Sequence, residues 1–246
     1  MKTTLIIPDC HHPSVDRKAW DLLLKVGLDQ NIDTIVIIGD FGDFASVSSH
    51  AKSPTQRLLG LAEEIFACNA ALSELEQLKA TSHIFVMGNH EDRLSRYIGE
   101  RCPELHGVYG TSIETALRLT ERGYDVVPYR SHTYRDGIYY THDTGTAGLN
   151  AHRTSLNKFQ RDVVIGHTHR IGFETKRTIN GVPITGYMCG WLGDADKCAG
   201  YMHSASSTTD WCHGFGMAYT DYNRSHIVPV VIQEDYSCVV GGKLYR

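Results

Sequence analysis

Five short polar clusters, each directly after a short hydrophobic run, constrain the fold of this chain more than any other feature. The clusters are Asp9-Cys10-His11, Gly39-Asp40-Phe41-Gly42-Asp43, Gly88-Asn89-His90-Glu91, His142 and Gly166-His167-Thr168-His169. The runs before them, residues 5–7, 35–38, 84–87, 138–140 and 163–165, are short and apolar, which is typical of buried strands. Each cluster is therefore expected at the carboxyl end of a strand.

The polar residues in these clusters are the kinds that bind metal ions. In an extended segment Asp9 and His11 face one site while Cys10 faces away, and His167 and His169 are related in the same way. Imidazole and carboxylate without thiolate suit Mn, Fe, Zn, Co or Ni, and the histidines argue against Ca or Mg. We therefore expect two divalent transition-metal ions, with Mn as the first choice.

The clusters resemble the motifs of the calcineurin-like metallophosphoesterase family, which run DxH, GDxxD, GNH(D/E), a single His after a strand, and GHxH. All five occur here in that order between residues 9 and 169, about two thirds of the chain. The resemblance implies an α/β fold, a four-layer αββα sandwich with two mixed β-sheets and a binuclear metal site at strand carboxyl ends. A short segment, residues 211–215, also resembles family members encoded by bacteriophages.

The resemblance implies a role for each motif residue. One ion would be held by Asp9, His11, Asp40 and His169, and the other by Asp40, Asn89, His142 and His167, so that Asp40 bridges the two. A metal-bridging hydroxide would attack phosphorus. His90 would protonate the departing oxygen as general acid, and Asp43 would orient its imidazole.

Two positions depart from the family pattern. The single His is usually followed by Gly, but here Asp143 follows His142, and His132 is a rival for the same role. His142 is preferred because it directly follows an apolar run. His12 lies beside His11, and we expect it to line the pocket or to be exposed.

Substrate choice is expected in the arginine-rich interval between the third motif and His142. Residues 93–135 are a candidate cap insertion, and Arg93 and Arg96 are the candidate substrate-binding residues because Arg binds phosphate in a bidentate manner. The alternative for both is a salt bridge on a helix surface. Residues 186–246 are expected to form a strand-rich C-terminal extension of a single domain, 1–246. Within it, Cys189, Cys198, His203, Cys212 and His213 have no zinc-site spacing, and residues 204–209 are expected to form a loop.

Helical periodicity predicts helices over residues 15–29 and 55–79. In the second, Leu58, Leu61, Ala62, Ile65, Leu72, Leu75 and Leu78 form an apolar stripe that we expect to face the core, with the acidic residues facing water.

Composition limits the function classes. The net charge is −4 and no Lys/Arg-rich run occurs, which favours a nucleotide or short oligonucleotide over long nucleic acid as the phosphate-ester substrate. Seven cysteines without a C-x-x-C pair indicate free thiols, and with no apolar run long enough to cross a membrane we expect a cytoplasmic protein. Three functions stay open: a phosphatase or phosphodiesterase, a nuclease acting on DNA or RNA, and a catalytically inactive binding scaffold. Metal identity and oligomeric state stay open too.

Overall fold

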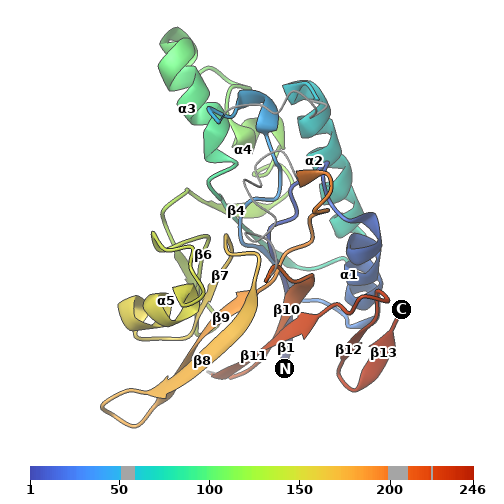
Figure 1. Cartoon of the computed structure of the whole chain (residues 1–246), viewed down its shortest axis with the longest axis vertical. Coiled ribbons are helices and arrows are strands. Elements are labelled where there is room, and N and C mark those ends of the chain that lie inside the picture. Colours follow the sequence, from blue (N-terminus) through green and yellow to red (C-terminus); the bar gives the residue numbers. More distant parts are fainter. Residues whose placement is uncertain (51–58, 199–209, 223) are drawn as a thin grey trace.

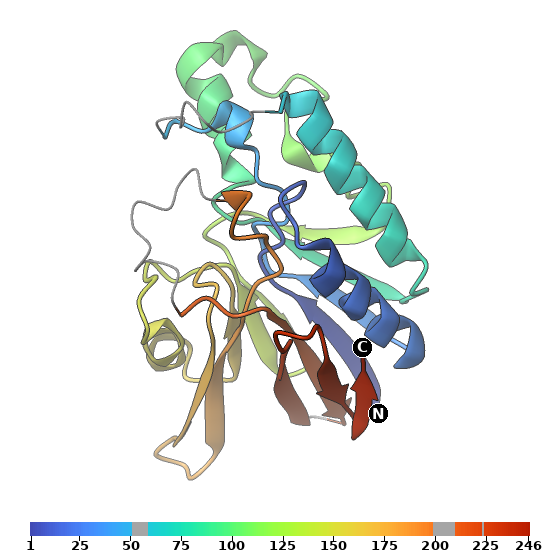
Figure 2. The same ribbon diagram turned by 45° about the vertical axis from the view of Figure 1, so that its right-hand side comes forward.

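The computed structural model describes residues 1–50, 59–198, 210–222 and 224–246. Two mixed sheets lie face to face and helices cover their outer faces (Figures 1 and 2). Within the described part of the chain, no helix is long and apolar enough to cross a membrane.

The first sheet has six strands in the order β11-β10-β1-β2-β3-β4. Strands β1 (Lys2–Ile7), β2 (Thr34–Ile37), β3 (Ser82–Val86) and β4 (Tyr124–Val127) are parallel. Strand β10 (Gly214–Asp221) pairs antiparallel with β1, and β11 (Arg224–Val231) pairs antiparallel with β10. The parallel strands bring the ends of β1, β2 and β3 to one edge of the sheet.

The second sheet has five strands in the order β5-β6-β7-β9-β8. Its centre, β6 (Ile138–Thr141), β7 (Val163–Ile165) and β9 (Pro183–Cys189), is parallel. The outer strands β5 (Thr133–Arg135) and β8 (Ile171–Arg177) run antiparallel to their neighbours. Strands β8 and β9 form the long hairpin that projects from the body in Figure 1.

The apolar side chains divide the molecule into layers. Residues of both sheets, including Ile6, Val36, Tyr140 and Val164, form one buried cluster between the sheets. Helices α1 (Arg17–Asp29) and α2 (Leu61–Glu76) share a second core with the other face of the first sheet. Helix α5 (Ala151–Phe159) packs on β7 and β9 of the second sheet. The predicted four-layer αββα sandwich is confirmed.

The helices begin later than the sequence pattern suggested. Helix α1 begins at Arg17 because the carboxylate of Asp16 accepts the N–H groups of Lys18 and Ala19 as an N-cap. Helix α2 begins at Leu61, and residues 55–58 of the predicted helix, Leu58 among them, lie outside the described residues.

The expectation that the acidic residues of α2 face water is wrong for Glu64. Glu64 is buried, and its carboxylate accepts hydrogen bonds from the N–H groups of Ala45 and Ser46, at the short helix η1 (Ala45–Val47). Ala62 of the predicted apolar stripe is exposed instead. Helix α2 is thus tied to the loop after β2 by a carboxylate.

The two regions set apart in the sequence contribute to the body of the fold. Residues 93–135 contain β4 and β5, one in each sheet, together with most of α3 (Asp92–Arg101), η2 (Pro103–Leu105) and α4 (Ile113–Ala116). Residues 186–246 contain β10 and β11 and a separate hairpin of β12 (Cys238–Val240) and β13 (Lys243–Tyr245). The cap predicted at residues 93–135 stays a prediction. Because β4 and β5 belong to the sheets, only α3, η2 and α4 of this interval could form it.

Candidate metal centre

The loops after β1, β2, β3, β6 and β7 bring the five polar clusters together. Close approach between these loops requires glycine at the start of the motifs. A Cβ atom at Gly39 would lie 2.4 Å from His142 Nδ1, and one at Gly88 would lie 2.2 Å from Asp40 Oδ1. Gly39 also has φ +94°, which glycine adopts without strain.

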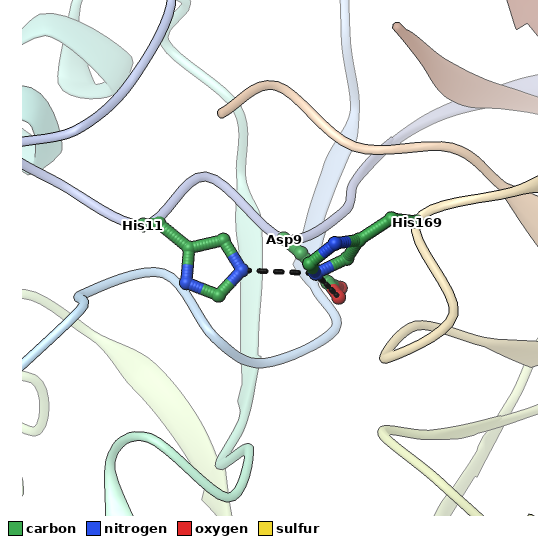
Figure 3. Close-up of side chains that lie close together, drawn as sticks. All are labelled: Asp9, His11 and His169. Carbon is green, nitrogen blue, oxygen red and sulfur yellow. Dashed lines mark hydrogen bonds and ion pairs between the residues drawn. The ribbon is translucent and has the colours of Figure 1, made fainter. Parts of the chain in front are cut away.

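The first group of candidate ligands is Asp9, His11 and His169 (Figure 3). His11 Nε2 lies 3.0 Å from His169 Nε2, and His169 Nε2 lies 3.1 Å from Asp9 Oδ2. The other carboxylate oxygen, Asp9 Oδ1, accepts the N–H of His167 at 3.1 Å, which fixes the carboxylate. All three ligand residues are buried. Converging nitrogen and oxygen lone pairs of this kind fit a divalent transition metal.

The second group is Asp40, His142 and His167, with Asn89 beside them. His142 Nε2 lies 3.3 Å from Asp40 Oδ2 and 3.0 Å from Asn89 Oδ1. His142 Nδ1 donates to the carbonyl oxygen of Ile38 at 2.8 Å, which orients the ring and directs Nε2 into the site. Asp40 Oδ1 accepts the N–H of His90 at 2.9 Å.

The electrostatics of the second group favour a cation. Burial alone would lower the pKa of His142, but the charges of Asp40 and Asp9 raise it to about 10. The pKa of Asp40 is held well below its usual value, against its burial, by His142 and His90. Burial and His142 lower the pKa of His167, so this imidazole is available as a neutral ligand. Burial and His90 lower the pKa of His11 to about 3, which leaves its ring neutral as well.

Four of the candidate ligands have a left-handed backbone. His11, Asp40, His167 and His169 have φ between 48° and 66°. This conformation costs a non-glycine residue on the order of 1 kcal/mol. Backbone strain of this kind is found at functional sites, although other non-glycine residues of this chain, such as Asn31, Lys79 and Gln160, also have positive φ.

His90 and Asp43 form a hydrogen-bonded pair next to both groups. His90 Nδ1 lies 2.9 Å from the Asp43 carbonyl oxygen and 3.1 Å from Asp43 Oδ1. His90 Nε2 lies 3.7 Å from Asp40 Oδ2, and this distance also lets His90 form a group with His11 and Asp40. The pairing is the one predicted for an acid and the carboxylate that orients it.

The two candidate substrate-binding arginines lie in different settings. Arg93 is buried, donates to the Asp43 carbonyl oxygen at 2.6 Å and donates to His90 Nε2 at 2.9 Å. Arg96 is half exposed, pairs with Asp92 at 2.9 Å and donates to the Asn89 carbonyl oxygen at 3.2 Å. Arg93 therefore contacts His90 and its partner Asp43, and Arg96 contacts Asn89 in the same loop as His90.

The histidines that the sequence left as alternatives, His132 and His12, belong to no group of candidate ligands among the described residues. His132 packs against Tyr139 and Phe159 at ring distances of 5.4 and 5.2 Å. His12 is buried between Trp20 and Phe41, and burial lowers its pKa to about 3. It therefore belongs to the core and is not exposed.

The C-terminal Cys and His residues form no metal-ligating group among the described residues. Cys189 and Cys198 are buried, Cys212 is exposed, and His213 Nε2 lies 2.8 Å from the Gly193 carbonyl oxygen. His203 and the loop predicted at residues 204–209 lie outside the described residues.

Sequence reasoning missed two residues that support the site. The buried Glu91 carboxylate accepts the N–H groups of Asp40, Gly42 and Gly88, at 2.9, 3.0 and 2.8 Å, and so joins two motif loops. The Trp191 ring stacks on His169 at 4.8 Å with a 13° interplanar angle. Glu91 stands inside a recognised motif, whereas no sequence signal marked Trp191.

Neighbouring groups of His and Asp that could hold metal ions lie at strand carboxyl ends of two mixed sheets, which is the arrangement of a metallophosphoesterase-class fold. A family model for calcineurin-like phosphoesterases matches residues 2–171. The chain belongs to the calcineurin-like phosphoesterase family, whose chemistry is metal-dependent phosphoester hydrolysis.

Two phage proteins are similar over almost their whole length. The Gene 54 protein of Mycobacterium phage L5 is 28% identical over 251 residues, covering 94% of this chain and 94% of the relative. The Gene 54 protein of Mycobacterium phage D29 is 27% identical over 248 residues, with the same coverage of 94% on both sides.

Solved structures with low sequence identity cover nearly the whole chain. Vps29 of Chaetomium thermophilum is 13% identical with a TM-score of 0.49, and covers 99% of this chain and 93% of its own. YfcE, a phosphoesterase from E. coli, is 14% identical with a TM-score of 0.46, and covers 97% of each chain.

Proposed function

We propose that this protein is a hydrolase that cleaves phosphate esters with two divalent transition-metal ions, Mn²⁺ being the first choice. The observation that carries the proposal is the convergence of two donor sets, Asp9, His11 and His169 in one and Asp40, His142 and His167 in the other, with His90 beside both. Asn89 completes the second set through Oδ1, and Asp40, which lies in one group with His11 and in another with His142, is placed to serve both ions.

The ions, when bound, would lower the pKa of a water molecule and neutralise charge on the phosphoryl oxygens. The residues supply positioning and a proton. Two buried carboxylates, Asp9 and Asp40, balance only part of the charge of two divalent ions, so the site attracts an anionic ester.

His90 is the proposed general acid. Its Nδ1 faces Asp43, so the proton for the departing oxygen would come from Nε2. In this structure Arg93 donates to Nε2, and this nitrogen cannot accept from Arg93 and carry its own proton together. We therefore propose that the Arg93 guanidinium moves from Nε2 to a phosphate oxygen when an ester binds, which retains Arg93 as a substrate-binding residue.

Long nucleic acid is the weaker alternative as substrate. Most arginines with described side chains are already paired with carboxylates, among them Arg17, Arg118, Arg122, Arg135, Arg153 and Arg170. The net charge of −4 also disfavours binding to the negatively charged backbone of long nucleic acid. An inactive scaffold is disfavoured because every motif residue is present.

The test is Mn²⁺-supplemented turnover of a bis-aryl phosphate diester against the matching aryl monoester, with metal content measured on the same samples. We expect turnover of at least one ester, which Asp40→Ala abolishes together with metal binding. His90→Ala should lower kcat by roughly 10²- to 10⁴-fold and keep its metal. Asp221→Asn, at the opposite end of the first sheet, is the control.

Two results would contradict the proposal in different ways. Loss of metal from His90→Ala would make His90 a ligand. Tight metal binding without turnover of either ester, with Mn, Fe, Zn, Co and Ni each tried, would leave the inactive scaffold as the function.

A further inference from the structure

A cavity of about 650 Å³ opens beside the candidate metal centre, on the side of the second sheet. His167, a member of the second ligand group, lines it. Thr141 and Asp143, the neighbours of His142, line it too. A group bound here could therefore belong to the same molecule as a phosphate at the candidate metal centre.

Aromatic side chains form two parts of the cavity wall. The Tyr129 ring lies 6.4 Å from the His142 ring, on the side of the metal centre. Phe159 and His132 form another part, with ring centroids 5.2 Å apart. Tyr139 lies behind them, 4.8 Å from Phe159, and supports that wall. Tyr129 and Phe159 are partly buried and His132 is exposed, and rings that face a cavity in this way provide stacking surfaces for a flat ligand.

The polar lining suits a neutral ring system attached to an anion. Arg130 lies over the Tyr129 ring at 5.3 Å and makes no ion pair with a described carboxylate. Thr144 and Thr146 also line the cavity, where their hydroxyl groups lie 3.3 Å apart and that of Thr144 lies 2.9 Å from the Ser155 hydroxyl. The Asp143 carboxylate accepts the N–H of Gly145 at 2.7 Å, which holds it in its own loop.

We propose that this cavity holds the organic group of the ester and selects a planar aromatic one, the base of a nucleotide. This inference rests on the proposed function for the position of the phosphate. The volume lies within the range of about 300 to 1,000 Å³ that is usual for small-molecule sites. A sugar phosphate without a base would reach the metals and leave the aromatic walls without a partner.

The first experiment compares esters that differ only in the base. The pairs are adenosine 5′-monophosphate against ribose 5-phosphate, and the methyl diesters of the same two compounds, measured with Mn²⁺. We expect kcat/KM to favour the nucleotide by about tenfold or more, since a stacked base contributes a factor of this order. Tyr129→Leu and Phe159→Leu should each reduce that preference about fivefold or more.

The matched control is Phe173→Leu, because Phe173 is an exposed ring on β8 that does not line the cavity. It should keep the full preference. Far-UV circular dichroism on each variant verifies folding, and Arg130→Ala, an exposed position, tests the same cavity without removing a packed ring.

A binding measurement separates this inference from the proposed function. Calorimetry with adenosine 5′-monophosphate and metal-free protein should show binding that weakens in Tyr129→Leu and Phe159→Leu. If the wild type binds the nucleotide in this way but hydrolyses no ester, the cavity assignment holds and the proposed function fails. If the wild type hydrolyses both members of a pair equally, the proposed function holds and the cavity assignment is overturned.

Discussion

Glu91 joins two of the loops that carry candidate metal ligands. Its carboxylate accepts three backbone N–H groups from the loops after β2 and β3, and a glutamine would place an amide NH₂ against one of these donors. We expect Glu91→Gln to lower the free energy of unfolding by about 1–3 kcal/mol, measured by urea denaturation.

The control for this change is Glu100→Gln on α3, an exposed glutamate outside the described ion pairs. It should alter the free energy of unfolding by less than about 0.5 kcal/mol. Equal effects from the two changes would show that the loops are held by other contacts.

Trp191 is expected to position His169. Trp191 is 2% exposed, and its ring stacks on the His169 imidazole in the first group of candidate ligands. We expect Trp191→Ala to weaken metal binding by about 10- to 100-fold, as is usual for groups that orient a ligand. Trp191→Phe keeps an aromatic face and should restore most of the affinity, measured by metal titration. An alanine variant with wild-type metal affinity would limit Trp191 to packing.

At the residue scale, the sequence predicted the candidate ligands that stand in motifs, and it missed side-chain contacts that depend on long-range packing. Asp9 and His11 follow β1 of the first sheet and His169 follows β7 of the second, and their place in the family's ordered motifs made them predictable as neighbours. The stack of Trp191 on His169 depends on the path of the chain after β9. No periodicity or spacing carries that information.

At the scale of elements, the contact between α5 and the second sheet depends on one glycine. A Cβ atom at Gly186 of β9 would lie 2.4 Å from the His152 carbonyl oxygen and 3.1 Å from Leu156 Cβ, both on α5. Backbone on the helix cannot give way locally. We expect Gly186→Ala to lower the free energy of unfolding by about 1–3 kcal/mol in thermal or urea denaturation.

Gly172→Ala on the neighbouring strand β8 is the matched control. Its Cβ atom would meet Met188 Cε at 3.2 Å, which is the end of a flexible side chain. It should cost less than Gly186→Ala. A larger loss from Gly172→Ala would mean that β8, not α5, limits the packing of this sheet.

The strands before the motifs were predictable from the sequence, and the borders of the helices less so. Apolar runs mark β1, β2, β3, β6 and β7 because both faces of these strands are buried. The burial of Glu64 was not predictable, because its partners on η1 come from an earlier loop. The sheet order, with β10 beside β1, also requires contacts between distant parts of the chain.

At the scale of the molecule, the candidate ligands join the two sheets. Asp9, His11, Asp40 and Asn89 follow strands of the first sheet, whereas His142, His167 and His169 follow strands of the second. Each ion would therefore connect one sheet to the other. Metal binding should then stabilise the whole fold.

The size of that stabilisation follows from mass action. With the free ion at 100 times its dissociation constant, the native state gains about 2.7 kcal/mol per site, provided that the unfolded chain does not bind the ion. For a chain of this length we expect each bound Mn²⁺ ion to raise Tm by roughly 5–10 °C, about 10–20 °C for two ions, and EDTA to reverse the rise, measured by differential scanning calorimetry. Asp40→Ala removes the ligand that serves both groups and should lose most of the rise, while Asp221→Asn, at the far end of β10, should keep it. An equal rise in both variants would show that the stabilising ion is bound at a site elsewhere on the molecule that does not include Asp40.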